Sequence, residues 1–216
     1  IIGLFHRLTP AGFYYKTFMW PPSFWRYYEY FIRRAAGLGK APTEPDPDQY
    51  DRINANADVV IVGAGPAGLA AAHSAALSGA RVIIADDQVE PGGWLLNERY
   101  EIDDKPTKEW VDKVIKELTE IKEVTVLKRT TVFGLYDHNF LGMIEQRGPK
   151  LSDGEGKTRQ RIWRVRAQKV ILATGAIERP MIFSNNDRPG VMLASAVRGY
   201  VNRYGVAAGQ RGAIFT

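Results

Sequence analysis

Short apolar runs alternate with glycines and with helical patterns through much of this chain. Residues 59–62 and 82–85 are apolar at every position and mostly β-branched, which is typical of parallel strands buried on both faces. The residues between these runs, from Pro66 to Ser78, are mostly small and predict a helix that packs closely on the first strand. A strand, a glycine turn, a helix and a second strand therefore follow one another, as at the start of an α/β fold.

A second helix is predicted where apolar residues recur every three or four positions after Thr107, which is expected to cap it. Lysines and acids occupy the opposite face of this helix, and residues 124–127 then supply a third parallel strand. The positions expected to pack on the sheet are Trp110, Val111, Val114, Ile115, Leu118 and Ile121.

Between residues 130 and 166 the helical spacing of apolar residues gives way to the pattern of short strands. Three short strands are predicted, at 130–136, 140–146 and 161–166, with polar turns between them such as the loop at 152–156. They form a small antiparallel meander, after which residues 169–175 return the chain to the parallel sheet. The predicted fold class is therefore α/β: a Rossmann-like parallel sheet with helices and an antiparallel β-meander insertion, preceded by an aromatic-rich helical arm.

The arm occupies the first 40 residues, where Ser23 is expected to cap a helix that runs to Ala36 and ends at Gly37 or Gly39. Aromatic side chains on more than one face make a solvated helix unfavourable. Three packing partners remain open: the helix's own domain, a neighbouring domain or partner subunit, and a membrane surface. The aromatic residues are Phe13, Tyr14, Tyr15, Phe18, Trp20, Phe24, Trp25, Tyr27, Tyr28, Tyr30 and Phe31.

The amino-acid composition excludes several classes of function. The net charge is +5, but basic and acidic residues alternate, so no nucleic-acid footprint is predicted. The sequence has no cysteine, which excludes disulfides and cysteine-ligated metal sites from these residues and leaves nicotinamide and flavin chemistry open. No apolar stretch is long enough to span a bilayer and no signal-peptide pattern is present, so we expect a cytoplasmic protein without a membrane partner.

The glycine turn reads Gly63-Ala64-Gly65-Pro66-Ala67-Gly68. Gly63 permits a tight turn, Gly65 lets the backbone approach a pyrophosphate, and Gly68 lets the helix lie close on the strand. The helix, which starts at Pro66 and Ala67, begins beneath the phosphates, where its N–H groups and dipole oppose their charge.

Further candidate residues follow the other strands. Asp86 ends the second strand about twenty residues after the glycines and is expected to accept hydrogen bonds from the ribose hydroxyls. Asp87 adds negative charge, which disfavours a 2′-phosphate and hence NADP. Gly93 lies in a double-glycine turn, and Thr174 and Gly175 end the returning strand, where small residues leave room for a dinucleotide.

These motifs divide the chain into three parts. Residues 1–40 are the arm with one helix, residues 41–56 are a proline-rich acidic linker, and residues 57–216 are an FAD/NAD(P)-like dinucleotide-binding domain. The chain begins with Ile1, and its last five residues look like the start of a buried strand. We therefore expect a piece of a longer polypeptide, with the last domain truncated at its C-terminus.

No catalytic or metal-ligating residue is predicted. His6, His73 and His138 lie too far apart for ligand spacing, and Ser195 has no nucleophile elbow around it and is assigned to packing in a helix over 191–204. Glu178 and Arg179 either pair with each other on the surface, which is favoured, or meet the cofactor.

Four longer segments resemble the α subunits of heterotetrameric sarcosine oxidases, at residues 16–21, 33–39, 176–180 and 185–192. The resemblance covers nearly the whole chain. It implies an oxidoreductase subunit several times longer than this chain, which holds NAD noncovalently at the glycine turn. It also implies that FAD, FMN and the site that oxidises sarcosine, a small secondary amine, lie in or at a partner subunit.

Subunits of opine, proline and cyanide-forming amine dehydrogenases resemble the same segment, and that resemblance implies FAD in place of NAD. Both dinucleotides present a pyrophosphate and an adenosine ribose to the same groups, so the choice stays open. Two functions remain: the dinucleotide-binding portion of a multi-subunit amine oxidoreductase, and a structural dinucleotide-binding module without redox chemistry of its own.

Overall fold

The computed structural model describes residues 20–39, 43–46, 48–148 and 158–215. The chain divides into two compact units, residues 1–47 and 48–216. The aromatic residues before Trp20, His6 and the predicted loop at 152–156 lie outside the described residues.

The first unit holds one α-helix, whose start differs from the prediction. A 3₁₀ turn, η3 (Pro22–Phe24), leads directly into α2 (Trp25–Ala35), and the N–H of Phe24 donates to the carbonyl of Pro21 at 3.1 Å. Ser23 therefore lies inside the 3₁₀ turn and caps neither helix. The predicted N-cap is wrong because Pro22, whose fixed φ suits the first position of a helical turn, starts the turn one residue earlier.

The end of α2 agrees with the prediction. Gly37 has φ of 70°, and its N–H donates to the carbonyl of Arg34 at 3.2 Å. The N–H of Leu38 donates to the carbonyl of Arg33 at 3.0 Å, which completes a Schellman motif. No residue of α2 is buried, and aromatic side chains presented in this way are typical of contact surfaces.

The second unit is built on one six-stranded sheet with the order β5-β2-β1-β8-β7-β6. The first four strands are parallel, and β7 and β6 continue the sheet as an antiparallel meander. A two-stranded hairpin, β3 (Glu101–Ile102) with β4 (Lys105–Pro106), lies outside the sheet. The six strands are β1 (Gln49–Val62), β2 (Val82–Ala85), β5 (Val124–Leu127), β6 (Thr130–Tyr136), β7 (Phe140–Gln146) and β8 (Thr158–Leu172).

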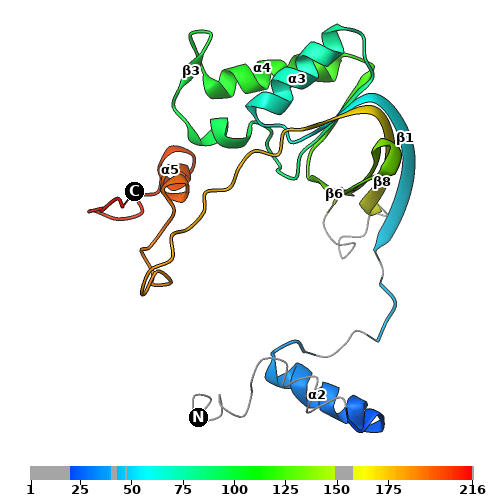
Figure 1. Cartoon of the computed structure of the whole chain (residues 1–216), viewed down its shortest axis with the longest axis vertical. Helices are drawn as coiled ribbons and strands as arrows, with labels where there is room; N and C mark the ends of the chain where they lie inside the picture. The colour runs from blue at the N-terminus through cyan, green and yellow to red at the C-terminus, as the bar shows by residue number, and fades with distance from the viewer. Residues whose placement is uncertain (1–19, 40–42, 47, 149–157, 216) are drawn as a thin grey trace. The chain divides into compact units, whose positions relative to one another are not determined.

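Two strands are longer than predicted. β1 begins at Gln49, inside the segment interpreted as a linker, and pairs with β8 from Gln49 opposite Thr158 to Val62 opposite Leu172. The separate strands predicted at 161–166 and 169–175 are a single strand, β8 (Figure 1). Its N-terminal half pairs with β7, so one strand serves both the meander and the parallel sheet. The predicted α/β class with a β-meander is thus confirmed, but the meander is an extension of the sheet.

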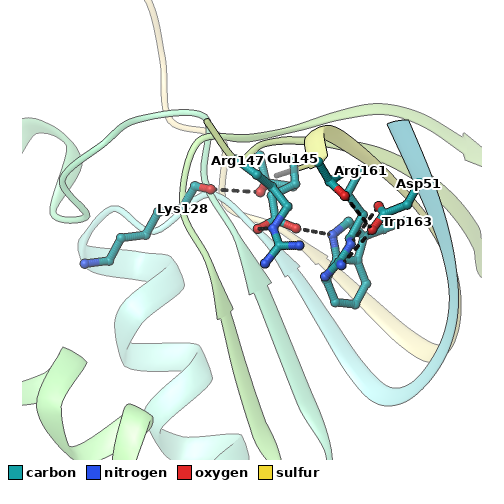
Figure 2. A network of polar contacts seen from close by, with 8 residues as sticks. Asp51, Lys128, Glu145, Arg147, Arg161 and Trp163 are labelled. Atoms are coloured by element: carbon teal, nitrogen blue, oxygen red, sulfur yellow. Dashed lines mark hydrogen bonds and ion pairs between the residues drawn. The ribbon is translucent and has the colours of Figure 1, made fainter. Parts of the chain in front are cut away.

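A polar network connects the N-terminal parts of β1 and β8 with the C-terminal part of β7 (Figure 2). The guanidinium of Arg161 on β8 donates two 2.8 Å hydrogen bonds to the carboxylate of Asp51 on β1 and lies over the ring of Trp163. The indole of Trp163 donates to Glu145 on β7 at 2.8 Å, and Arg147 lies 3.4 Å from the same carboxylate. The hydrogen bond with Arg161 lowers the pKa of Asp51. Specific polar pairs across three strands therefore help to set their register.

Two helices cover one face of the parallel strands (Figure 1), α3 (Pro66–Leu77) and α4 (Thr107–Glu120). Thr107 is the first residue of α4, and its hydroxyl donates to the carbonyl of Leu95 at 3.1 Å; the predicted cap is therefore wrong. The threonine instead ties the helix start to the preceding 3₁₀ turn, η4 (Gly93–Asn97). The buried residues on this face are Ile61, Ala64, Leu69, Ala72, Ala76, Val82, Ile84, Val111, Val114 and Leu118.

A second core forms on the opposite face, where the meander curls against the parallel strands. The first residue of β6, Thr130, donates its N–H to the carbonyl of Asp86, just after β2, at 2.7 Å. Because side chains alternate along a strand, Ile61 faces the helices and Val60 faces the meander. The buried residues on this face are Ala57, Val60, Ile83, Ala85, Leu127, Leu141, Met143 and Val165.

Asp58 joins three neighbouring strands of the sheet through its carboxylate. It accepts hydrogen bonds from the backbone N–H of Arg81 at 2.8 Å and from the Arg81 guanidinium at 2.9 and 3.1 Å. The amide of Gln168 on β8 also donates to it at 2.8 Å. The hydrogen bonds from Arg81 lower the pKa of Asp58 from 3.8 to about 2.

This shift predicts a specific acid sensitivity. The pKa is lower in the folded state, so the contribution of ionised Asp58 is complete above about pH 4 and is lost as the pH falls towards about 2. We expect Asp58→Asn to flatten the pH dependence of Tm in this window, measured by circular dichroism. Asp112→Asn is the control, because the 3.6 Å contact of Asp112 with Lys108 lies between two exposed side chains. An Asp58→Asn profile parallel to that of the unmodified chain would contradict the assignment.

Candidate functional site

The glycine turn lies at the carboxyl end of β1, at the edge of the sheet where parallel α/β folds place their ligands. Gly63 has φ of 101°, and its N–H donates to the carbonyl of Ala85 at 2.8 Å. A Cβ at Gly63 would lie 2.9 Å from the carbonyl carbon of Ala173, after β8. Both the left-handed conformation and the close approach of β8 therefore require glycine at position 63.

Gly68 lies where α3 passes closest to β1. A Cβ at this position would overlap the carbonyl oxygen of Gly63 and lie 3.0 Å from its carbonyl carbon. The helix can therefore rest on the strand end only with glycine at position 68, as predicted.

Gly65 differs from the other two glycines because its surroundings are open. It is the N-cap of α3, with φ of −73° and ψ of −175°, and no atom lies within 4 Å of a Cβ placed on it. Pro66 is the first residue of the helix, and both Pro66 and Ala67 are exposed. The first-turn N–H groups of α3 therefore lie beside free space, in the arrangement that binds anionic phosphates.

The side chain of Asp86 turns back towards the glycine turn. Its carboxylate accepts hydrogen bonds from the N–H of Ala64 at 2.6 Å and from the N–H of Gln88 at 2.8 Å. Asp86 therefore braces the glycine turn, a role that the sequence did not reveal. A carboxylate has about four acceptor positions, so the predicted bonds with ribose hydroxyls remain compatible with these two. The neighbouring Asp87 is exposed and accepts a 2.9 Å hydrogen bond from the side chain of Gln88.

The double-glycine turn packs against the glycine turn. The N–H of Gly92 donates to the carbonyl of Ala64 at 2.7 Å, and Gly92 and Gly93 have φ of 126° and 54°. A Cβ at Gly93 would lie 3.0 Å from the Cα of Gly65. The turn after β2 therefore borders the site directly at Gly65.

The segment after β8 closes the other side. The N–H of Ala173 donates to the carbonyl of Val62 at 2.8 Å, which places Thr174 and Gly175 beside the glycine turn. Gly175 has φ of 72° and open space around it. The indole of Trp94 reaches the carbonyl of Ala176 at 3.4 Å. The structure thus brings together the ten predicted site residues: Gly63, Gly65, Pro66, Ala67, Gly68, Asp86, Asp87, Gly93, Thr174 and Gly175.

A pocket lies beside these residues, between η4, the segment after Gly175 and α5 (Ala194–Asn202). α5 begins three residues later than predicted. Ser195, assigned to packing from sequence, is half-buried in the first turn of α5 and donates its backbone N–H to the carboxylate of Glu178 at 2.7 Å. No ion pair joins Glu178 to Arg179 among the described residues, so the favoured surface pair is wrong. The lining residues are Trp94, Asn97, Ile177, Glu178, Leu193, Ser195, Ala196, Gly199, Tyr200, Arg203 and Tyr204.

Two properties of the described ranges bear on the chemistry. These ranges contain no group of three or more histidine, aspartate or glutamate side chains placed to hold a metal ion. In the same ranges, no helix combines the length and the apolar character needed to cross a membrane.

Comparison with known proteins gives one family match and several similar chains. The family model described as "Pyridine nucleotide-disulphide oxidoreductase" matches residues 57–207. The sarcosine oxidase α subunit of Rhizobium meliloti (strain 1021) is 50% identical over 216 residues, which are 99% of this chain and 22% of that protein. The resemblance inferred from the sequence motifs is therefore confirmed.

Two other proteins are similar over less of the chain or at lower identity. An opine oxidase subunit from Agrobacterium tumefaciens (strain Ach5) is 34% identical over 146 residues, 65% of this chain and 28% of that protein. The crystal structure of L-proline dehydrogenase from P. horikoshii superposes with a TM-score of 0.58 at 26% identity, covering 79% of this chain and 32% of that one. The chain spans less than a third of the length of each of these three proteins.

Proposed function

This chain belongs to the pyridine nucleotide-disulphide oxidoreductase family, and on that basis we propose that its residues 57–216 bind a dinucleotide in the α subunit of a multi-subunit sarcosine oxidase. The observation that carries the proposal is the 50% identity over 99% of the chain to the α subunit of a sarcosine oxidase. Because that relative is named as a subunit, we expect this protein to assemble with further subunits, one of which would hold the site for the secondary amine. The proposed compartment is the cytoplasm.

The geometry of the second unit supports dinucleotide binding. The glycine turn places open space at Gly65 next to the first turn of α3, so backbone N–H groups can receive the pyrophosphate. Asp86 and Asp87 follow the neighbouring strand, where they can accept hydrogen bonds from the adenosine ribose. Gly93, Thr174 and Gly175 border the same space with glycine or a small side chain. Bound there, the dinucleotide would supply electron transfer, while these residues would bind and orient it.

NAD is the proposed dinucleotide, with FAD as the alternative. The adjacent carboxylates of Asp86 and Asp87 would repel the 2′-phosphate of a dinucleotide bound there, which opposes NADP. The sequence holds no cysteine, so these residues cannot form the redox-active disulfide that the family name mentions. No residue of this chain is proposed as an acid, base or nucleophile; FAD, FMN and the oxidation of sarcosine are proposed for a partner subunit.

The cofactor content of the purified protein tests this proposal. We expect the gently purified α subunit to release NAD on heating, in about one equivalent, with no flavin absorption of its own. Enzymatic assay of the released nucleotide and the visible spectrum measure the two quantities. The absence of any bound or exchangeable dinucleotide would overturn the proposed site.

A second function is favoured by the similarity to L-proline dehydrogenase and to an opine oxidase subunit. In that case the site would hold FAD, and a stoichiometric flavin spectrum would replace NAD release. A purely structural dinucleotide would give a third result: the nucleotide would be bound, but its redox state would not change while the complete enzyme turns over sarcosine.

A further inference from the structure

We infer that Glu178 is a positioning residue for the dinucleotide site: by binding the first turn of α5, its carboxylate fixes the segment that carries Thr174 and Gly175. The inference rests on the proposed function, because it assigns Glu178 a role in that same site.

Glu178 replaces the missing cap of α5. The N-cap residue, Leu193, has no side chain that can accept a hydrogen bond, and the helix has no acid in its first turn. The carboxylate of Glu178 accepts the N–H of Ser195 at 2.7 Å and that of Ala194 at 3.3 Å. Hydrogen bonds from Ser195 lower the pKa of Glu178, so the carboxylate is ionised and complements the positive end of the helix dipole at neutral pH.

α5 is itself anchored to the turn that borders the site. Arg198 lies 3.0 Å from the carboxylate of Glu98, and the side chain of Asn202 donates to the carbonyl of Asn97 at 2.8 Å. Arg203 lies 2.8 Å from Glu90, before the double-glycine turn. These three contacts attach the helix to residues on both sides of Gly93.

Burial does not hold the segment between Ala173 and Glu178. Thr174 to Glu178 are all exposed, and Ile177 is 93% exposed. Its described attachments are the pairing of Ala173 with Val62, the 3.4 Å contact of Trp94 with Ala176, and Glu178 itself. Because apolar packing contributes little here, loss of the Glu178 carboxylate would free the end of the segment that is farther from β8.

Two substitutions test whether Glu178 positions the segment or is merely an exposed charge on the surface. Glu178→Ala removes every acceptor, whereas Glu178→Gln keeps one carbonyl oxygen for the Ser195 N–H. Arg179→Ala is the matched control, because Arg179 is exposed and adjacent but takes no part in the contacts of α5 described above. All three are made in the full-length subunit within its complete enzyme.

We expect Glu178→Ala to raise the Kd of the dinucleotide that the unmodified enzyme binds by at least about fivefold. Amide hydrogen exchange of residues 174–178 should become faster, while the Tm of the dinucleotide-free protein should fall only slightly, as expected for the loss of one helix cap. Glu178→Gln should recover part of the affinity, and Arg179→Ala should leave both the Kd and the exchange unchanged.

The outcomes distinguish the inference from the proposed function. If the unmodified enzyme binds no dinucleotide, the proposed function fails, and hydrogen exchange still decides whether Glu178 holds the segment. If it binds dinucleotide and Glu178→Ala binds equally well, the positioning role is overturned. A fall in Tm larger than the loss of one helix cap explains, together with the raised Kd and without recovery in Glu178→Gln, would indicate a merely structural contact and would also overturn it.

Discussion

Gly65→Val should abolish dinucleotide binding and leave the fold intact. Position 65 has φ of −73° and ψ of −175°, a conformation that valine adopts readily and that suits the residue before proline. Apart from its chain neighbours, no atom lies within 4 Å of a Cβ there, so the first atom of the added side chain has open space around it. It would fill the space that the pyrophosphate needs beside α3. We expect the Kd to rise at least about a hundredfold.

Stability and affinity are measured separately for this variant. Loss of a glycine N-cap should cost about 1 kcal/mol at most, so the circular dichroism spectrum should be unchanged and the Tm should fall only slightly. Gly148→Val is the control, since Gly148 also has open space around it but lies at the end of the meander. Stoichiometric dinucleotide in the Gly65→Val protein would show that the pyrophosphate does not approach this turn.

Gly68→Ala should greatly lower the stability of the fold, whereas Gly65→Val should affect mainly dinucleotide affinity. Alanine normally stabilises a helix interior relative to glycine by about 1 kcal/mol. Here its Cβ would overlap the carbonyl oxygen of Gly63, which belongs to backbone fixed by the sheet. α3 would have to move away from β1 and open the core around Leu69, which is fully buried. We expect a fall of about 3 kcal/mol in the free energy of unfolding, measured by denaturant titration.

A second helical glycine provides the matched control. A Cβ at Gly199 in α5 would lie 3.6 Å from the side chain of Asn97, an ordinary van der Waals distance. Gly199→Ala should therefore be neutral or raise stability by up to about 1 kcal/mol. If both variants shifted stability by the same amount, helix propensity rather than close packing on β1 would explain the result at Gly68.

The strand, glycine turn, helix and strand around Gly63 were predictable because several local signals agree there. Gly63 has the positive φ of a tight turn, and Gly68 lies against the strand end, as the spacing indicated. Local rules also restricted the end of α2 to Gly37 or Gly39, and Gly37 is the residue that ends it. In each case the requirement lies in the residue itself: a missing Cβ permits a conformation or an approach that other residues exclude.

Features that depend on distant partners were not predictable. The sequence pattern divides β8 at Ala167 and Gln168, but the pairing with β1 continues across this break, from Ala57 opposite Ala167 to Val59 opposite Lys169. Thr107 looks like a cap in sequence, but it is the first residue of α4, and its hydroxyl donates to the carbonyl of Leu95, twelve residues earlier. The neighbour of Glu178 in sequence is Arg179, whereas its partner Ser195 lies 17 residues away. Local propensity cannot rank such partners, because they become neighbours only when the chain folds.

The long pairing of β1 with β8 restricts the motion of the glycine turn and the segment at Ala173 more than that of the double-glycine turn. The glycine turn follows β1 and the segment at Ala173 follows β8. These two strands are hydrogen-bonded to each other up to their last residues, so bending of the sheet moves the turn and the segment in the same direction. The double-glycine turn is joined to them through one backbone hydrogen bond from Gly92, through the contact of Trp94 with Ala176, and through α5. Entry and exit of a ligand should therefore involve displacement of this turn together with α5, while the paired strand ends act as the stationary wall of the site.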